Sequence, residues 1–109
     1  MGWADDVQQE LARAKEAEES GNMGKARTSA RRAVGIALSE LQRRFPQRYH
    51  GQDFIRQMRS FAEDAALPHE VRSAAVRLQA RISSDFTSPS LDPVRDAMTI
   101  IEYIDDQLS

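Results

Sequence analysis

Apolar residues recur at steps of three and four along almost the whole chain, and no useful length of it alternates with a period of two. Steps of three and four place side chains on one face of an α-helix, whereas a period of two is typical of a half-buried strand. The pattern therefore predicts an all-α protein. We expect an antiparallel, up-and-down helical bundle of four to five helices.

Four breaks divide the periodic pattern into helical segments. The first segment covers residues 4–20 and stops at "SGNMG", where Gly21 suits the left-handed position after a helix and Asn22 can cap the next one. Pro46 ends the second segment, because the residue before a proline is pushed out of the helical region. A Leu-Pro pair at 67–68 and an Asp-Pro pair at 92–93 mark the other two boundaries.

Each helical segment after the "SGNMG" break carries an apolar stripe that we expect to be buried. The second stripe, within residues 25–45, consists mostly of alanine, so a neighbouring helix can approach closely and this helix is predicted to be central. The third stripe is Phe54, Ile55, Met58, Phe61, Ala62 and Ala65; the fourth is Val71, Ala74, Ala75, Leu78 and Ile82; and the last is Val94, Ala97, Met98, Ile101, Ile104 and Leu108. Residues 83–93 are predicted to form a loop.

Length and composition limit the classes of protein. The 109 residues suit a single domain, 1–109, and the chain has no cysteine, which excludes disulfides and thiolate metal sites. The N-terminal stretch has neither a basic start nor an uninterrupted apolar run, so we expect no signal peptide, no membrane partner and a cytoplasmic location. No motif indicates a cofactor.

The charges are distributed unevenly. Residues 1–24 carry six acidic and two basic side chains, residues 25–81 carry five and twelve, and residues 82–109 carry six and one. The net charge of −2 thus combines a basic middle with two acidic ends. This split favours either a basic face for a phosphate-bearing partner or acidic terminal helices that neutralise basic central ones.

The stretch "AKEAEESGNMGKARTSARRAVGIALSEL" resembles the opening of the HEPN domains, where a helix, a small turn and an alanine-rich helix with a leucine-rich end follow one another. The later order is similar, with a His soon after the second helix, a Leu-Pro junction, and Asp-Pro before "VRDAMTIIEYI". The resemblance covers nearly the whole chain. It implies a helical bundle, a homodimer, and either RNA cleavage or association with nucleotides and nucleic acids.

Cleaving HEPN members carry an Arg and a His roughly four to six residues apart, which in the dimer supply charge stabilisation and acid–base chemistry. Arg44 and His50 have five residues between them. A metal-independent endoribonuclease that uses Arg44 and His50 is therefore one hypothesis. The family's motif sits later, where Arg77 and Arg81 have no His after them, so we favour a non-catalytic HEPN-like module.

A cluster of arginines with a nearby tyrosine has the chemistry of an RNA or nucleotide site, because guanidinium groups bind phosphate and an aromatic ring stacks on a base. Its members are Arg27, Arg31, Arg32, Arg43, Arg48 and Tyr49, with Arg44 beside them. Alternatively, these arginines are solvated or paired with Glu10, Glu16, Glu18 and Glu19 of the first helix. A protein-binding adaptor without nucleic acid is the third functional hypothesis.

The second histidine gives no further site. His69 follows a proline at a helix start, and we predict a surface residue there. His50, His69, Asp53 and Glu70 have no helical spacing that pairs them as ligands, so no metal is expected.

Overall fold

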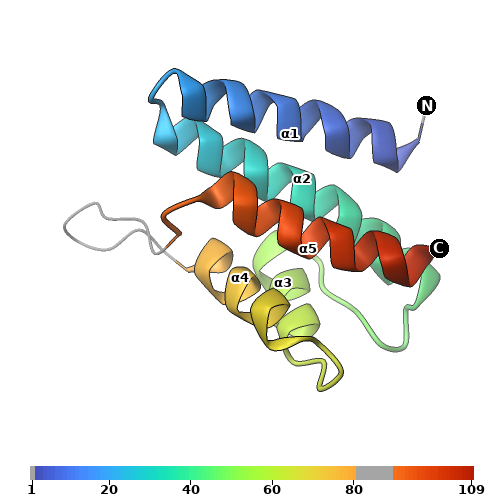
Figure 1. The fold of residues 1–109 in the computed structure, drawn as a ribbon. Helices are drawn as coiled ribbons and strands as arrows, with labels where there is room; N and C mark the ends of the chain where they lie inside the picture. The colour runs from blue at the N-terminus through green and yellow to red at the C-terminus, as the bar shows by residue number, and fades with distance from the viewer. Residues whose placement is uncertain (1, 81–89) are drawn as a thin grey trace.

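The computed structural model describes residues 2–80 and 90–109, and in this part of the chain it contains five α-helices and no strand (Figure 1). The helices are α1 (Trp3–Glu19), α2 (Met23–Arg44), α3 (Phe54–Ala62), α4 (His69–Gln79) and α5 (Pro93–Leu108). The predicted all-α class is confirmed. α1 and α2 form an antiparallel hairpin, and α5 lies along α2 (Figure 1). The short helix α4 packs mainly against α5, and the short helix α3 contacts α2 and α4.

Helix starts and turns follow the predicted local chemistry. Gly21 has a φ of 80°, a left-handed conformation that side chains disfavour, and it lets the chain reverse between α1 and α2. The Asn22 side chain accepts a hydrogen bond from the Lys25 backbone N–H at 3.1 Å. Asp53 and Asp92 cap α3 and α5 in the same way. These caps satisfy backbone donors that would otherwise lack a partner in the first turn of each helix.

α2 is the central helix, as its alanine-rich stripe predicts. It contacts all four other helices, most extensively α1 and α5. Its inward face includes Ala26, Ala30, Ala33 and Ala37, each of which is fully buried. Because these side chains are only methyl groups, the neighbouring helices pack against α2 at close range.

Larger core side chains come from all five helices and from the segment before α3. Phe61 on α3 is fully buried and lies between two tyrosines, with ring centroids 6.1 Å from Tyr49 and 6.0 Å from Tyr103. Aromatic rings at such distances attract one another through their quadrupoles. This cluster joins the connection after α2 to the C-terminal helix.

The third helix is shorter than predicted. It ends at Ala62, and Ala65 is exposed, because residues 63–67 form a turn in which the Asp64 carboxylate accepts the Ala66 backbone N–H. Ile55, which belonged to the predicted buried stripe, is 39% exposed. Ile82, Arg81 and most of the predicted 83–93 loop lie outside the described residues. None of the described helices is both long enough and apolar enough to span a lipid bilayer.

Candidate functional site

The end of α2 and the segment after it, residues 43–50, form what we call the corner. The Glu40 carboxylate accepts hydrogen bonds from both arginines of the last helical turn. Arg43 Nη2 lies 2.6 Å and Arg44 Nε 2.9 Å from the same carboxylate oxygen. The hydrogen bonds from Arg43 and Arg44 lower the pKa of Glu40 from 4.5 to about 2. One carboxylate therefore holds two of the predicted phosphate-binding cations.

A second carboxylate holds the rest of the corner. Asp64 accepts a hydrogen bond from Arg48 Nη2 at 2.8 Å and another from the Tyr49 hydroxyl. Tyr49 is only 3% exposed, and burial and its bond to Asp64 raise the pKa of its hydroxyl. The Tyr49 ring lies in the core against Phe61, so in this conformation it offers no exposed face for the predicted stacking on a base.

The structure does not bring Arg44 and His50 into one pocket. Arg44 Nη1 donates a hydrogen bond to the Leu108 carbonyl at 3.0 Å, and the side chain lines a shallow pocket with Phe45 and Arg48. His50 lines a different pocket, which it shares with Arg56 and Arg59 of α3. The two residues of the cleavage hypothesis thus face different surroundings.

Arg27 is a structural residue. It is 8% exposed, and its guanidinium donates hydrogen bonds to two carbonyls at the end of α4, those of Leu78 at 3.4 Å and of Ala80. Burial lowers the pKa of Arg27. In this conformation Arg27 Nη2 serves the open carbonyls of a helix end, and Nε is buried without a hydrogen-bond partner among the described residues, so the side chain is not presented to a phosphate at the surface.

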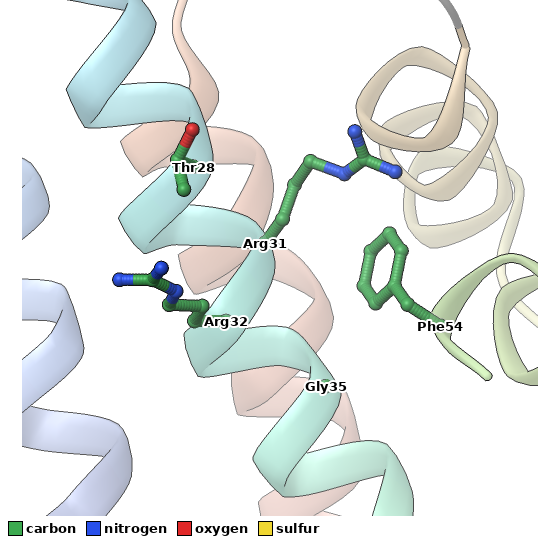
Figure 2. Close-up of a pocket in the computed structure, with 5 residues that line it drawn as sticks. All are labelled: Thr28, Arg31, Arg32, Gly35 and Phe54. Atoms are coloured by element: carbon green, nitrogen blue, oxygen red, sulfur yellow. The ribbon is translucent and has the colours of Figure 1, made fainter.

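The other two predicted arginines line an open trough on α2, between α1 and α3 (Figure 2). Its lining residues are Thr28, Arg31, Arg32, Gly35 and Phe54, and its volume is about 290 Å³. Thr28 and Gly35 lie along the exposed face of α2, Arg31 extends toward Phe54 and α4, and Arg32 extends toward α1 (Figure 2). The trough therefore has a cation on each side and an aromatic ring at one wall.

No carboxylate of the described chain pairs with either of these arginines. The Arg31 guanidinium lies 4.7 Å from the centre of the Phe54 ring, a cation–π contact that orients both groups. Burial, followed by repulsion from Arg27, lowers the pKa of Arg31. Positive charge that nothing in the trough neutralises favours an anion there.

Direct ion pairs do not carry the predicted neutralisation by the first helix in the described residues. Glu10 pairs with Arg13 of its own helix at 3.0 Å, and no ion pair joins Glu16, Glu18 or Glu19 to a central arginine in residues 2–80 and 90–109. The other terminal helix contributes one such pair, in which Arg77 on α4 bonds Asp96 on α5 at 2.8 Å.

The remaining candidates behave as surface residues. His69 is exposed and its ring lies 3.5 Å from the Ser73 hydroxyl. Within the part of the chain that the structure describes, no three side chains of the metal-binding types cluster around a common point. No family model, curated protein or solved structure matches this chain.

Sequence reasoning identified Arg31 and Arg32 but missed the rest of the trough. Phe54 was assigned to the buried stripe of α3, and it is half-buried, with its ring forming a wall of the trough. Gly35 received no role from the sequence, yet a Cβ there would lie 3.5 Å from Phe54. The sequence did contain a signal for this site. Gly35 lies close to Arg31 and Arg32 on one predicted helix, and Phe54 directly follows the capping residue Asp53 at the start of the next.

Proposed function

We propose that this chain is a non-catalytic, HEPN-like helical bundle that binds nucleotide units, either free or within a nucleic acid, in the trough on α2. The observation that carries the proposal is that Arg31 and Arg32 flank the trough, next to the Phe54 ring, without a carboxylate partner in residues 2–80 and 90–109. Guanidinium groups bind phosphate through two parallel hydrogen bonds, and an aromatic ring stacks on a base whatever its sequence.

We also propose that the protein is a cytoplasmic homodimer. In the same proposal the helices are arranged up and down, with α3 and α4 acting as one broken element. The support for a homodimer, beyond the HEPN-like order of segments, is exposed apolar surface. Phe45, Val76 and Leu91 are 41%, 50% and 86% exposed. Large apolar side chains that solvent contacts favour association with a second surface.

The test is equilibrium binding of a labelled single-stranded RNA to the purified protein, measured by fluorescence anisotropy at low salt. Arg31→Gln with Arg32→Gln should weaken binding by about tenfold or more, because each lost charged contact removes roughly a tenfold factor. Lys15→Gln with Arg95→Gln is the matched control, since it removes two exposed cations away from the trough. Equal effects of the two double variants would contradict a site in the trough.

Light scattering and a gel of the recovered RNA separate the hypotheses. A homodimer that binds RNA and leaves it intact is the expected result. Shortened RNA that becomes intact with His50→Ala would instead establish the ribonuclease, and an absence of binding would leave the protein-binding adaptor.

A further inference from the structure

We propose that the trough is one end of a longer groove that binds a single strand of nucleic acid, and that Arg56 and Arg59 hold a second phosphate at its other end. This inference rests on the proposed function and extends it from one nucleotide unit to several. It assigns a ligand to the pocket around His50, which the cleavage hypothesis does not explain.

The lining residues connect the two ends. A hollow of about 470 Å³ adjoins the trough and shares Arg32, Gly35 and Phe54 with it. The same hollow shares Gln52 with the pocket around His50, which has a volume of about 520 Å³. A continuous depression therefore runs from α2, past the start of α3, to the side of α3 that carries its arginines.

The second end has free donors. Arg56 and Arg59 are exposed and lie three residues apart on α3, so their side chains project from the same side of the helix. Arg59 forms no hydrogen bond or ion pair through its side chain with any residue in 2–80 or 90–109. Arg56 reaches Asp53 only at 3.8 Å, and both side chains are solvent-exposed, so this pair is weak.

The wall of this second end is fixed in place. The His50 backbone N–H donates to the buried Ser60 hydroxyl oxygen at 3.1 Å, and Gln42 donates to the Gly51 carbonyl at 3.1 Å. Gly51 has a φ of 148°, and a Cβ there would lie 2.5 Å from the Gln57 backbone nitrogen. The segment that presents His50 is thus tied to α2 and α3, which reduces the ordering that a ligand must impose.

The carboxylates along the groove are mostly engaged. One Glu10 oxygen accepts a hydrogen bond from Arg13, while the other is buried and has no hydrogen-bond partner among the described residues. One Asp53 oxygen accepts the Arg56 backbone N–H at 2.9 Å. Glu63 is the exception, since it lines the far end, is exposed and has no partner among the described residues. Its negative charge repels a phosphate and so marks the limit of the strand's path.

A single strand fits this order of groups. Cations stand at both ends, and the Phe54 ring lies between them, where it can stack on an unpaired base. A duplex keeps its bases stacked on one another and offers no free base face to Phe54. The chemistry is shared by RNA and DNA, and oligonucleotides of each sugar distinguish them.

The experiment measures anisotropy with fluorescent single-stranded oligonucleotides from one to eight nucleotides, as RNA and as DNA, and with a hairpin duplex. Arg56→Gln with Arg59→Gln should leave the mononucleotide affinity unchanged and weaken the longest oligonucleotide by about tenfold or more. It should also reduce the slope of log K against log salt by about 0.7, since the two arginines hold one phosphate and each single-strand phosphate contact contributes about 0.7. Lys15→Gln with Arg95→Gln is again the control, and circular dichroism checks the fold.

Glu63→Gln gives a change of opposite sign, because it should tighten binding of the longest oligonucleotide by a few-fold. The groove is overturned if affinity does not rise with length, or if the Arg56 and Arg59 variant binds all lengths like the control. In that case the proposed function still stands when Arg31→Gln with Arg32→Gln weakens every ligand. Absence of binding by any oligonucleotide would overturn both proposals, and tighter binding of the duplex would overturn the single-strand assignment alone.

Discussion

The corner and the trough contain the same kinds of residue, arginines and an aromatic ring, yet they differ in what surrounds those residues. In the corner, Glu40 and Asp64 bind all three arginines, and Tyr49 is buried. In the trough, Phe54 is half-buried, and Arg31 and Arg32 have no carboxylate partner within the part of the chain that the structure describes. The density of arginines in a sequence thus indicates less about binding than the placement of a few carboxylates does.

The largest expected effect comes from the corner's buried ring. Tyr49→Ala should lower the free energy of unfolding by about 3–5 kcal/mol, because it leaves a cavity beside Phe61 and removes the bond to Asp64. Urea denaturation followed by circular dichroism measures this. Arg31→Gln should change stability little in the same assay. If Tyr49→Ala unfolds as late as the wild type, the distinction between a structural corner and a binding trough fails.

Substitution by alanine should change the stability of the protein in opposite directions at Gly51, directly after the corner, and at Gly35, in the trough. Gly51→Ala should destabilise the protein by about 2 kcal/mol, because its φ is positive and its Cβ would collide with the backbone at Gln57. Gly35→Ala should stabilise α2 by up to about 1 kcal/mol, since its Cβ meets Phe54 at an ordinary contact distance. Thermal melts of the two variants measure the difference, and a shared sign would contradict it.

Acid should loosen the corner through Asp64. Burial acts to raise the pKa of Asp64, but bonds from Tyr49, from the Ala66 backbone and from Arg48 outweigh it and hold the pKa below 3.8. Because the folded-state pKa is depressed, this stabilisation is present above about pH 4 and is lost as pH falls through the lowered value. Asp64→Asn should cost about 1 kcal/mol at pH 7.

Unfolding curves at several pH values check this prediction. The deficit of Asp64→Asn relative to the wild type should shrink below pH 3.8. A deficit that stays constant down to pH 2 would show that the charge of Asp64 does not contribute to stability.

The smallest expected effect comes from freeing the corner's cations. Glu40→Gln removes the carboxylate that holds Arg43 and Arg44, so binding of single-stranded RNA should rise by a few-fold and depend more steeply on salt. Anisotropy titrations at two salt concentrations measure this change. No gain in affinity would mean that pairing with carboxylates is not what separates the two regions.

Local signals in the sequence predicted most of the fold, because caps and turns depend on neighbours. Asn22 and Asp92 cap helices where the sequence indicated, and α2 has the central place that its alanines predicted. The predicted end of α3 was wrong, because Asp64 organises the turn after this helix. The Asp64 carboxylate accepts a hydrogen bond from Arg48, sixteen residues earlier. Propensity within a segment carries no information about such a partner.

The site was less predictable for the same reason. Arg27 and Arg31 are one turn apart and look alike in sequence, but Arg27 finds its partner at Leu78, 51 residues away. Only the approach of the end of α4 to Arg27 separates this structural arginine from the partly exposed Arg31. The six arginines and one tyrosine selected from sequence alone therefore divide into two that line the trough and five that the fold uses or pairs.

Arg27 also gives α2 a mechanical role. Its guanidinium bonds carbonyls at the end of α4, a helix that is distant in sequence, and so fastens the end of α4 to the beginning of α2. If α4 moved away, the Arg27 guanidinium would lose these carbonyl partners. Because Arg27 lies one helical turn from Arg31, it would then add a third positive charge beside the trough. The position of α4 therefore determines how much positive charge lies beside the trough and is available to a ligand.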